Sequence, residues 1–191
     1  MKTKLCAFLL VILMSLVVAN IVIIHKKAVY VEPKENLLAT SSIIEEMKIE
    51  EDPIVYDGLT YDELVDKINL SLHSTISNKG DLFVSYSLEV GVNPYLAVAI
   101  VLHETGCKWE CSNLVKKCNN VGGQKGGPSC NGGSYKSYPS LDEGIKGYID
   151  NLSKNYIQKG LLTPEQIGPK YAASKTWATK INKYIKEIKE K

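Results

Sequence analysis

The chain has 191 residues, of which 45% are hydrophobic and 23% are charged, and its formal net charge is +2. This length excludes two large domains, a Rossmann enzyme with a separate substrate domain, a TIM barrel and a multi-pass transporter. All 23 basic residues are lysines. The chain therefore lacks the bidentate guanidinium clamps that favour phosphate and base-edge recognition, and nucleic acid is not an expected partner.

The amino-terminal segment contains a charge-free apolar run, residues 5–24, with lysines on both sides. A helix of this length rises about 30 Å, the thickness of the hydrocarbon core of a bilayer. We expect residues 1–27 to form a single-pass membrane anchor, with the rest of the chain on the outer side of the membrane. A cleaved signal peptide, which would give a secreted form, is the alternative, because Val17 and Ala19 resemble the small residues before a cleavage site.

The next segment, residues 28–57, carries eight acidic residues and two lysines, with prolines at positions 33 and 53. It has no sustained hydrophobic period, which predicts an acidic, extended stalk. Residues 58–191 carry 17 lysines and 13 acidic residues, a net charge of +4. A segment of this length buries roughly two-thirds of its surface in a single core. We therefore expect one folded domain from residue 58 to the end.

Helical signals dominate this domain. Each expected helix begins at a capping residue or carries apolar residues at helical spacing. The expected helices cover residues 60–72, 81–90, 94–105, 140–154, a short stretch from 163, and 174–188, the last with Trp177 on its apolar face. The third of these helices is apolar on all sides, which predicts that it lies at the centre of the core. The fold class is therefore mainly α, with a central buried helix.

The segment between the third and fourth helices, residues 107–139, is too rich in glycine to form a long helix. We expect an irregular lobe here, a loop with a short hairpin. Four of the five cysteines lie in it, and their spacing lacks the paired C-x2-C knuckles of zinc sites. Behind an export segment, two disulfides are expected instead, with three possible pairings. The candidate cysteines are Cys107, Cys111, Cys118 and Cys130.

An ionisable pair, His103 and Glu104, stands at the end of the apolar central helix. Partial burial against the core and the negative end of the helix dipole both disfavour an ionised carboxylate. A carboxylic acid that keeps its proton suits general acid catalysis on a glycosidic oxygen. The alternative is an exposed glutamate at a frayed helix end. A zinc protease motif would need a second histidine where Cys107 stands, so no metal is expected.

Four ordered segments carry a resemblance to a known family. The first is residues 93–106, which begin with Asn-Pro and end with Glu-Thr-Gly, and the second is Asn-Asn-Val-Gly-Gly-Gln-Lys-Gly at 119–126. The third, at 135–148, contains Tyr135, Tyr138, Ser140, Glu-Gly-Ile at 143–145 and Tyr148. The fourth, at 168–178, begins with Gly-Pro-Lys-Tyr-Ala and ends with Trp-Ala. Together they resemble the glucosaminidase (mannosyl-glycoprotein endo-β-N-acetylglucosaminidase-like) family of the lysozyme-like superfamily, which are bacterial peptidoglycan hydrolases. The resemblance extends from about residue 59 to residue 188.

The resemblance implies a lysozyme-like domain that cleaves peptidoglycan glycan strands without a cofactor, with Glu104 matching the catalytic acid. Aromatic faces suit sugar rings, and amides suit hydroxyl groups. The substrate-binding residues implied by the resemblance are Asn120, Gln124, Lys125, Tyr135, Tyr138 and Tyr148. The residues alone also allow core packing for Tyr148 and a solvated loop charge for Lys125. Gly123 stands where the family usually has an aromatic residue, and the clustered cysteines are not part of its usual pattern.

A second catalytic carboxylate remains unassigned at this level. Glu143 is a candidate, but its position three residues after Ser140 predicts a capping role. Asp142, Asp81 and Glu110 are further options. Hydrolysis by an activated water, assistance from the N-acetyl group of the substrate, and lytic transglycosylation stay open, as does cleavage as a muramidase. A non-catalytic wall-binding module is one alternative from another class, and a modestly basic domain suits an anionic wall polymer. A disulfide-stapled envelope assembly protein with unidentified partners is a second.

Overall fold

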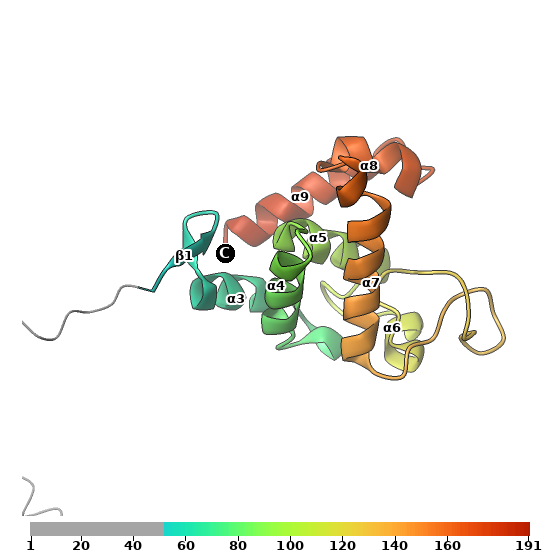
Figure 1. Cartoon of the computed structure of the whole chain (residues 1–191). Helices are drawn as coiled ribbons and strands as arrows, with labels where there is room; N and C mark the ends of the chain where they lie inside the picture. Colours follow the sequence, from blue (N-terminus) through green and yellow to red (C-terminus); the bar gives the residue numbers. More distant parts are fainter. Residues whose placement is uncertain (1–51) are drawn as a thin grey trace, which may run out of the picture. The chain divides into compact units, whose positions relative to one another are not determined.

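The computed structural model describes residues 52–191, so the predicted anchor at 5–24 and most of the predicted stalk lie outside the described residues. The described part is mainly helical, as predicted. Its α-helices, labelled as in Figure 1, are α3 (Tyr61–Asn69), α4 (Gly80–Glu89), α5 (Pro94–Thr105), α6 (Asn113–Cys118), α7 (Leu141–Asn155), α8 (Pro164–Tyr171) and α9 (Trp177–Lys189). Two single turns of 3-10 helix (Ser74–Ile76 and Ile157–Lys159) and an antiparallel pair, β1 (Ile54–Tyr56) and β2 (Leu59–Thr60), complete it.

Helix α5 forms the centre of the core, as its all-round apolar sequence predicts. Ten of its 12 residues are buried. The helix packs most extensively against α9, and α4 lies against it as well. The amphipathic helices around it each contribute one apolar face, for example Leu64 and Ile68 from α3 and Ile181 and Ile188 from α9. The position of its last turn is therefore fixed by packing on several sides.

The ends of α5 follow from local chemistry. The side chain of Asn93 accepts hydrogen bonds from the backbone N–H groups of Tyr95 and Leu96, and Pro94 occupies the first helical position. Gly106 ends the helix in the left-handed conformation, with φ of 68°. These signals are readable in the sequence, and the observed bounds equal the predicted ones. They determine where the ionisable pair at the end of the helix is presented.

The folded part begins earlier than the boundary predicted at residue 58. Strand β1 pairs with β2 across Asp57 and Gly58, which both have positive φ (53° and 78°). An Asp-Gly pair is a strong signal for a tight hairpin turn, because both central residues of that turn need positive φ. Residues 54–57 therefore belong to the domain and not to an extended stalk.

The irregular lobe between α5 and α7 contains more helix than expected. Helix α6 was not predicted, and it is six residues long, ending where Asn119 adopts φ of 54°. The predicted short hairpin is present as two antiparallel bridges, Lys125 with Tyr135 and Ser129 with Lys136. Figure 1 shows this hairpin as a long loop standing away from the helices. Among residues 52–191, no helix combines the length and the apolar character needed to span a bilayer.

Candidate active site

Glu104 lies in the last turn of α5 with its side chain exposed, between the buried residues Leu102 and Thr105. We expected this side chain to be partly buried against the core, but it is exposed in the structure. The chain turns away at Gly106, so the last turn of the helix reaches the surface of the domain. An accessible carboxyl group thus stands at the end of a rigid, buried helix.

The indole of Trp177 holds this carboxyl group from one side. Its Nε1–H donates a hydrogen bond of 3.0 Å to Oε1 of Glu104. The side chain of Trp177 is only 2% exposed, so the donor is fixed in the core. An indole N–H only donates, so Oε1 acts as the acceptor. Trp177 therefore orients the carboxyl group through Oε1.

Two tyrosines extend the aromatic surface beside Trp177. The ring of Tyr171 stacks on Trp177 with centroids 4.8 Å apart, and Tyr156 lies 5.5 Å from Tyr171. Burial, and secondly the negative charge of Glu104, raise the pKa of the Tyr171 hydroxyl well above its usual range. Glu104 therefore lies close enough to this aromatic row to act on it electrostatically.

Tyr148, a predicted substrate-binding residue, lies behind this row inside the core. Its side chain is 1% exposed, and its hydroxyl donates a hydrogen bond of 3.0 Å to the carbonyl oxygen of Ala97. Burial, with smaller effects from Tyr171 and Glu104, raises the pKa of this hydroxyl well above its usual value. A ring this enclosed packs α7 onto α5 and offers no face to a sugar in this structure.

Asn120, a second predicted binding residue, braces the lobe. It is fully buried, and its amide donates hydrogen bonds of 2.8 Å to the carbonyl oxygens of both Gln124 and Lys136. Its own oxygen accepts a bond of 3.0 Å from the backbone N–H of Gln124. These three bonds use both N–H donors of the amide and one of the two lone pairs of its oxygen within the protein. The side chain joins the two arms of the hairpin.

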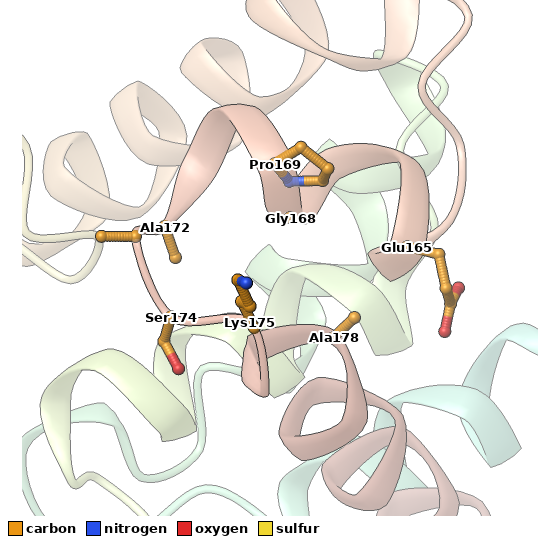
Figure 2. A pocket seen from close by; sticks show the side chains of 8 residues that line it. Glu165, Gly168, Pro169, Ala172, Ser174, Lys175 and Ala178 are labelled. Carbon is orange, nitrogen blue, oxygen red and sulfur yellow. The ribbon is translucent and has the colours of Figure 1, made fainter.

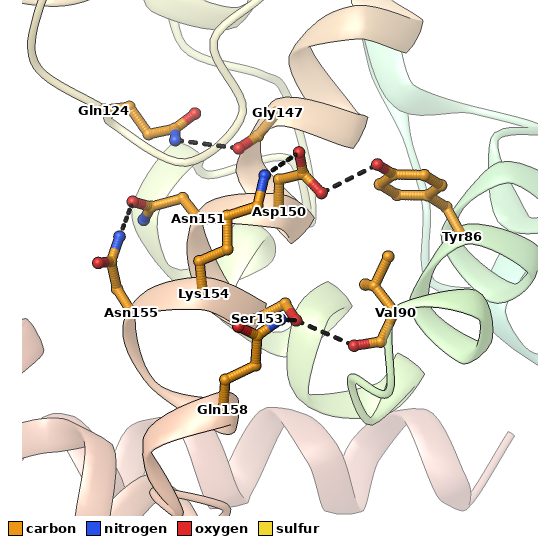
Figure 3. Close-up of polar contacts among 10 residues, drawn as sticks. All are labelled: Tyr86, Val90, Gln124, Gly147, Asp150, Asn151, Ser153, Lys154, Asn155 and Gln158. Atoms are coloured by element: carbon orange, nitrogen blue, oxygen red, sulfur yellow. Dashed lines mark hydrogen bonds and ion pairs between the residues drawn. The ribbon is translucent and has the colours of Figure 1, made fainter.

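Gln124 and Tyr138, also predicted to bind substrate, contact each other. The Tyr138 hydroxyl donates to Oε1 of Gln124, whose Nε2 donates a bond of 3.2 Å to the carbonyl oxygen of Gly147 in α7. Figure 3 shows this bond beside the contacts that tie α7 to α4, among them Tyr86 with Asp150. Tyr138 is 8% exposed. This pair fastens the lobe to α7.

Lys125 and Tyr135 differ from the other predicted binding residues because both are exposed. They face each other as partners in one of the two hairpin bridges, and Tyr135 is 43% exposed. Of the six residues that the resemblance implied, these two present side chains to solvent in this structure. The other four are engaged or enclosed within the protein.

The cysteines of the lobe form two disulfides between sequence neighbours, Cys107 with Cys111 and Cys118 with Cys130. The first closes the turn that follows α5, and the second joins the end of α6 to the hairpin. The prediction of two disulfides therefore agrees with the structure, which also selects one of the three possible pairings. Within residues 52–191, no cluster of three or more His, Cys, Asp or Glu side chains is arranged to hold a metal ion.

The carboxylates considered as a second acid have other contacts. Asp142 pairs with Lys79 at 2.6 Å, Asp81 accepts a hydrogen bond from a tyrosine, and Glu110 pairs with a lysine. The backbone N–H of Glu143 donates to the Ser140 hydroxyl oxygen, as in the predicted cap. The reciprocal bond of a capping box is not formed, and the Glu143 carboxylate instead meets the Ser140 hydroxyl at 3.5 Å.

A hollow of about 500 Å³ lies between α8 and the start of α9, and Figure 2 shows its lining. Its walls come from α8, from the linker between the two helices and from Ala178 of α9, with Glu165 and Lys175 as the charged residues. Gly168, one of its wall residues, lies close to the ring of Trp177. A Cβ atom at position 168 would be 3.3 Å from that ring. Trp177 therefore lies near a wall residue of the hollow and also binds Glu104.

Comparison with known protein families identifies the domain. A family model described as Glucosaminidase, mannosyl-glycoprotein endo-beta-N-acetylglucosaminidase, matches residues 80–190, more than half of the chain. The chain belongs to this glucosaminidase family. It is a glycosidase, and the resemblance inferred from the four sequence segments is confirmed. A comparison with curated proteins gave no match.

Solved structures show the same fold. A crystal structure of S. aureus autolysin E in complex with the muropeptide NAM-L-Ala-D-iGlu has 23% sequence identity and a TM-score of 0.56, covering 69% of this chain and 67% of autolysin E. A catalytic mutant of autolysin E, in which a glutamate is replaced by alanine, was solved with the disaccharide NAG-NAM. It has 21% identity and a TM-score of 0.51, with the same coverage. The lysozyme-like helical fold expected of the glucosaminidase domain is thus an autolysin fold.

Sequence reasoning did not assign Trp177 and Tyr171 to the neighbourhood of Glu104. Trp177 is 73 residues from Glu104 along the chain, and its spacing in α9 predicts only a core residue. The one available signal was the fourth segment of the resemblance, residues 168–178, which contains both aromatic residues. The packing of α9 on α5 brings Trp177 to the carboxyl group, and the packing of α8 on α9 stacks Tyr171 on Trp177.

Proposed function

We propose that this glycosidase cleaves glycosidic bonds in the glycan strands of peptidoglycan, with Glu104 as the general acid. The observation that carries the proposal is the exposed carboxyl group of Glu104, held by the buried indole of Trp177 at the end of α5. A relative with the same fold, autolysin E, has a catalytic mutant in which a glutamate is replaced. That finding supports a glutamate as the acid.

The geometry suggests how the acid works. Glu104, protonated on Oε2, transfers this proton to the glycosidic oxygen as the bond to the sugar carbon breaks. Water then adds to that carbon and gives a proton back to the Glu104 carboxylate. The carboxylate that remains keeps the hydrogen bond from Trp177 to Oε1. Hydrogen bonds to charged groups are stronger than those to neutral ones, so this bond stabilises Glu104 more after the proton has left. The indole thereby favours proton transfer as well as orienting the acid.

Peptidoglycan is the proposed substrate because autolysin E was crystallised with a muropeptide and with the disaccharide NAG-NAM. The net charge of +4 on residues 58–191 suits an anionic wall polymer. Lys125 and Tyr135 are the proposed direct contacts in the lobe, since their side chains are exposed. Asn120, Gln124 and Tyr138 are proposed to position the hairpin that presents them.

The proposed location is the outer face of a cell membrane. Residues 1–27 would anchor the chain through the apolar run 5–24, and the acidic segment that follows would separate the domain from the bilayer. Two disulfides in the lobe support an oxidising compartment, because disulfides form and persist outside the cytosol.

The test is clearance of a purified peptidoglycan suspension by the full-length chain in mild detergent. Glu104→Gln keeps the size of the side chain and the acceptor for Trp177 but carries no acidic proton. We expect the clearance rate to fall at least about 100-fold, the contribution typical of a general acid. Binding to the suspension, measured by co-sedimentation, should be retained.

The matched control is Glu143→Gln, the same substitution at an exposed position in the first turn of α7. It should keep most of the clearance rate. If wild type binds the suspension but releases no sugar ends, the chain is a wall-binding module and the proposal fails. If the Glu143→Gln rate falls as far as that of Glu104→Gln, the assignment of a single acid is wrong.

A further inference from the structure

Trp109 has the most exposed of the large hydrophobic side chains in the described part of the chain. It is 80% exposed, whereas the other tryptophan, Trp177, is 2% exposed. Tryptophan buries more apolar surface than most residues when it finds a partner, so a fully presented indole is unfavourable in water. The core does not use this side chain. Its exposure therefore suggests contact with something outside the domain.

The loop that carries Trp109 is held at both ends and in the middle. The Cys107–Cys111 disulfide encloses it, and both cysteines are buried. At its base, the backbone N–H of Ser112 donates a hydrogen bond of 2.9 Å to the carbonyl oxygen of Thr105. The backbone N–H of Trp109 itself donates a bond of 3.0 Å to the carbonyl oxygen of Gly106. The indole is thus presented by a preorganised loop, which reduces the entropy lost on binding.

An ion pair fixes the same loop to α9. Nζ of Lys108 lies 2.6 Å from the Glu187 carboxylate, and it is also 5.4 Å from the ring centroid of Trp109. Lys108 therefore connects α9 to the loop immediately beside the exposed indole. This side chain is used within the protein, so the surface offered to a ligand is mainly the apolar ring.

The position of Trp109 relates it to Glu104. The two residues are five positions apart, so their Cα atoms are at most about 18 Å apart, and the turn at Gly106 shortens this distance. Helix α9 gives a second measure. Trp177, near the start of α9, contacts Glu104. Tyr184 lies two helical turns, or about 10 Å, further along α9, and its ring centroid is 5.4 Å from Nζ of Lys108. The Cα atoms of Trp109 and Glu104 therefore lie within the length of a few sugar rings of each other.

We propose that Trp109 is a sugar-stacking platform that binds the apolar face of a pyranose ring in the glycan strand, at a subsite beside the ring whose bond Glu104 protonates. A flat indole matches the C–H face of a sugar ring, and the disulfide loop keeps it in place. This inference rests on the proposed function and adds a substrate contact that the four sequence segments do not include.

The first experiment separates binding from bond cleavage. The full-length Glu104→Gln variant is titrated with chitohexaose while tryptophan fluorescence is followed. The chain has two tryptophans, and one of them is already buried. We expect a blue shift of the emission on binding and its loss in Glu104→Gln with Trp109→Phe. Trp109→Ala should weaken chitohexaose binding about tenfold, and phenylalanine should recover part of the loss.

The second experiment compares kinetic constants in the active protein. Trp109→Ala should raise KM for soluble glycan strands about tenfold and change kcat less than about threefold. Leu70→Ala, which removes an exposed apolar side chain (57% exposed) elsewhere, is the matched control and should change neither. Replacing Cys107 and Cys111 together by serine should raise KM by a smaller factor than Trp109→Ala, because the indole is kept but the loop is freed.

The outcomes distinguish this inference from the proposed function. Unchanged KM, chitohexaose affinity and emission in the Trp109 variants overturn the platform, even if Glu104→Gln abolishes cleavage. A loss that appears only in binding to phosphatidylglycerol vesicles, or only in self-association during sedimentation, also overturns it. If wild type releases no sugar ends but the Trp109 variants still lose chitohexaose binding, the cleavage proposal fails and the platform stands.

Discussion

The helical body and the lobe at residues 107–139 are stabilised by different means. In the body, α5 is enclosed by apolar faces of its neighbours, and few polar side chains are buried. The lobe is held by two disulfides, by the hydrogen bonds of the buried Asn120 amide and by the hydrogen bond between Gln124 and Tyr138. A glycine-rich segment buries little apolar surface, so covalent and hydrogen-bonded contacts add to the few buried apolar residues of the lobe, such as Val115 and Val121.

The junction between the two regions should be the most sensitive point. A Cβ atom at Gly144 in α7 would overlap the carbonyl oxygen of Asn119, which ends α6. Gly144→Ala must therefore push the lobe away from α7, and we expect a loss of about 3 kcal/mol or more in the free energy of unfolding. Urea denaturation measures it. Lys146→Ala, an exposed neighbour on the same helix, should stay within about 0.5 kcal/mol of wild type.

The disulfides of the lobe should contribute unequally. Cys118–Cys130 closes a sequence separation of 12 residues, and Cys107–Cys111 one of 4. In the loop-entropy model these correspond to about 3 and about 2 kcal/mol. Replacing Cys118 and Cys130 by alanine should lower the free energy of unfolding more than replacing the other pair. Thermal denaturation of the two double variants ranks them, and the reverse order would contradict an entropic role.

Asn120 tests whether the lobe depends on a buried amide. Asn120→Ala removes three hydrogen bonds and leaves the backbone groups of Gln124 and Lys136 without these partners. We expect a loss of about 2 kcal/mol. Hydrogen exchange should accelerate at residues 124–136, while the amides of α5 change little. Equal acceleration in both regions would show that the lobe and the body unfold as one unit.

Alkaline pH should weaken the body through its buried tyrosines. Burial raises the pKa of Tyr148, so above pH 10 the unfolded chain loses this proton while the folded chain keeps it. Stability is therefore fully present below pH 10 and falls as the pH rises further. In Tyr148→Phe the fall should be shallower by up to about 1.4 kcal/mol per pH unit. Urea denaturation at pH 8 and pH 11 measures the difference, and parallel curves would contradict it.

The predictability of the two regions also differs. The bounds of α5 follow from Asn93, Pro94 and Gly106, which are local signals that the sequence displays. The Asp57-Gly58 turn is an equally local signal, but the acidic composition around it predicted a stalk instead. Helix α6 is too short to show a hydrophobic period.

The candidate site was predictable only in part. Glu104 stands out because it is ionisable at the end of an apolar helix. The roles of Asn120 and Gln124 were not readable, because an amide suits a sugar hydroxyl as well as a backbone carbonyl. Their partners, Lys136 and Gly147, lie 16 and 23 residues away along the chain. Only the fold decides between the two uses.

The central claim is that Glu104 protonates a glycosidic oxygen of peptidoglycan. The most direct measurement is mass spectrometry of the fragments that the full-length protein releases from purified peptidoglycan. We expect fragments with reducing N-acetylglucosamine ends from wild type and none from Glu104→Gln. Reducing or anhydro muramic acid ends would contradict the cleavage after N-acetylglucosamine that we propose from the description of the family. Equal release by wild type and Glu104→Gln would contradict the role of Glu104.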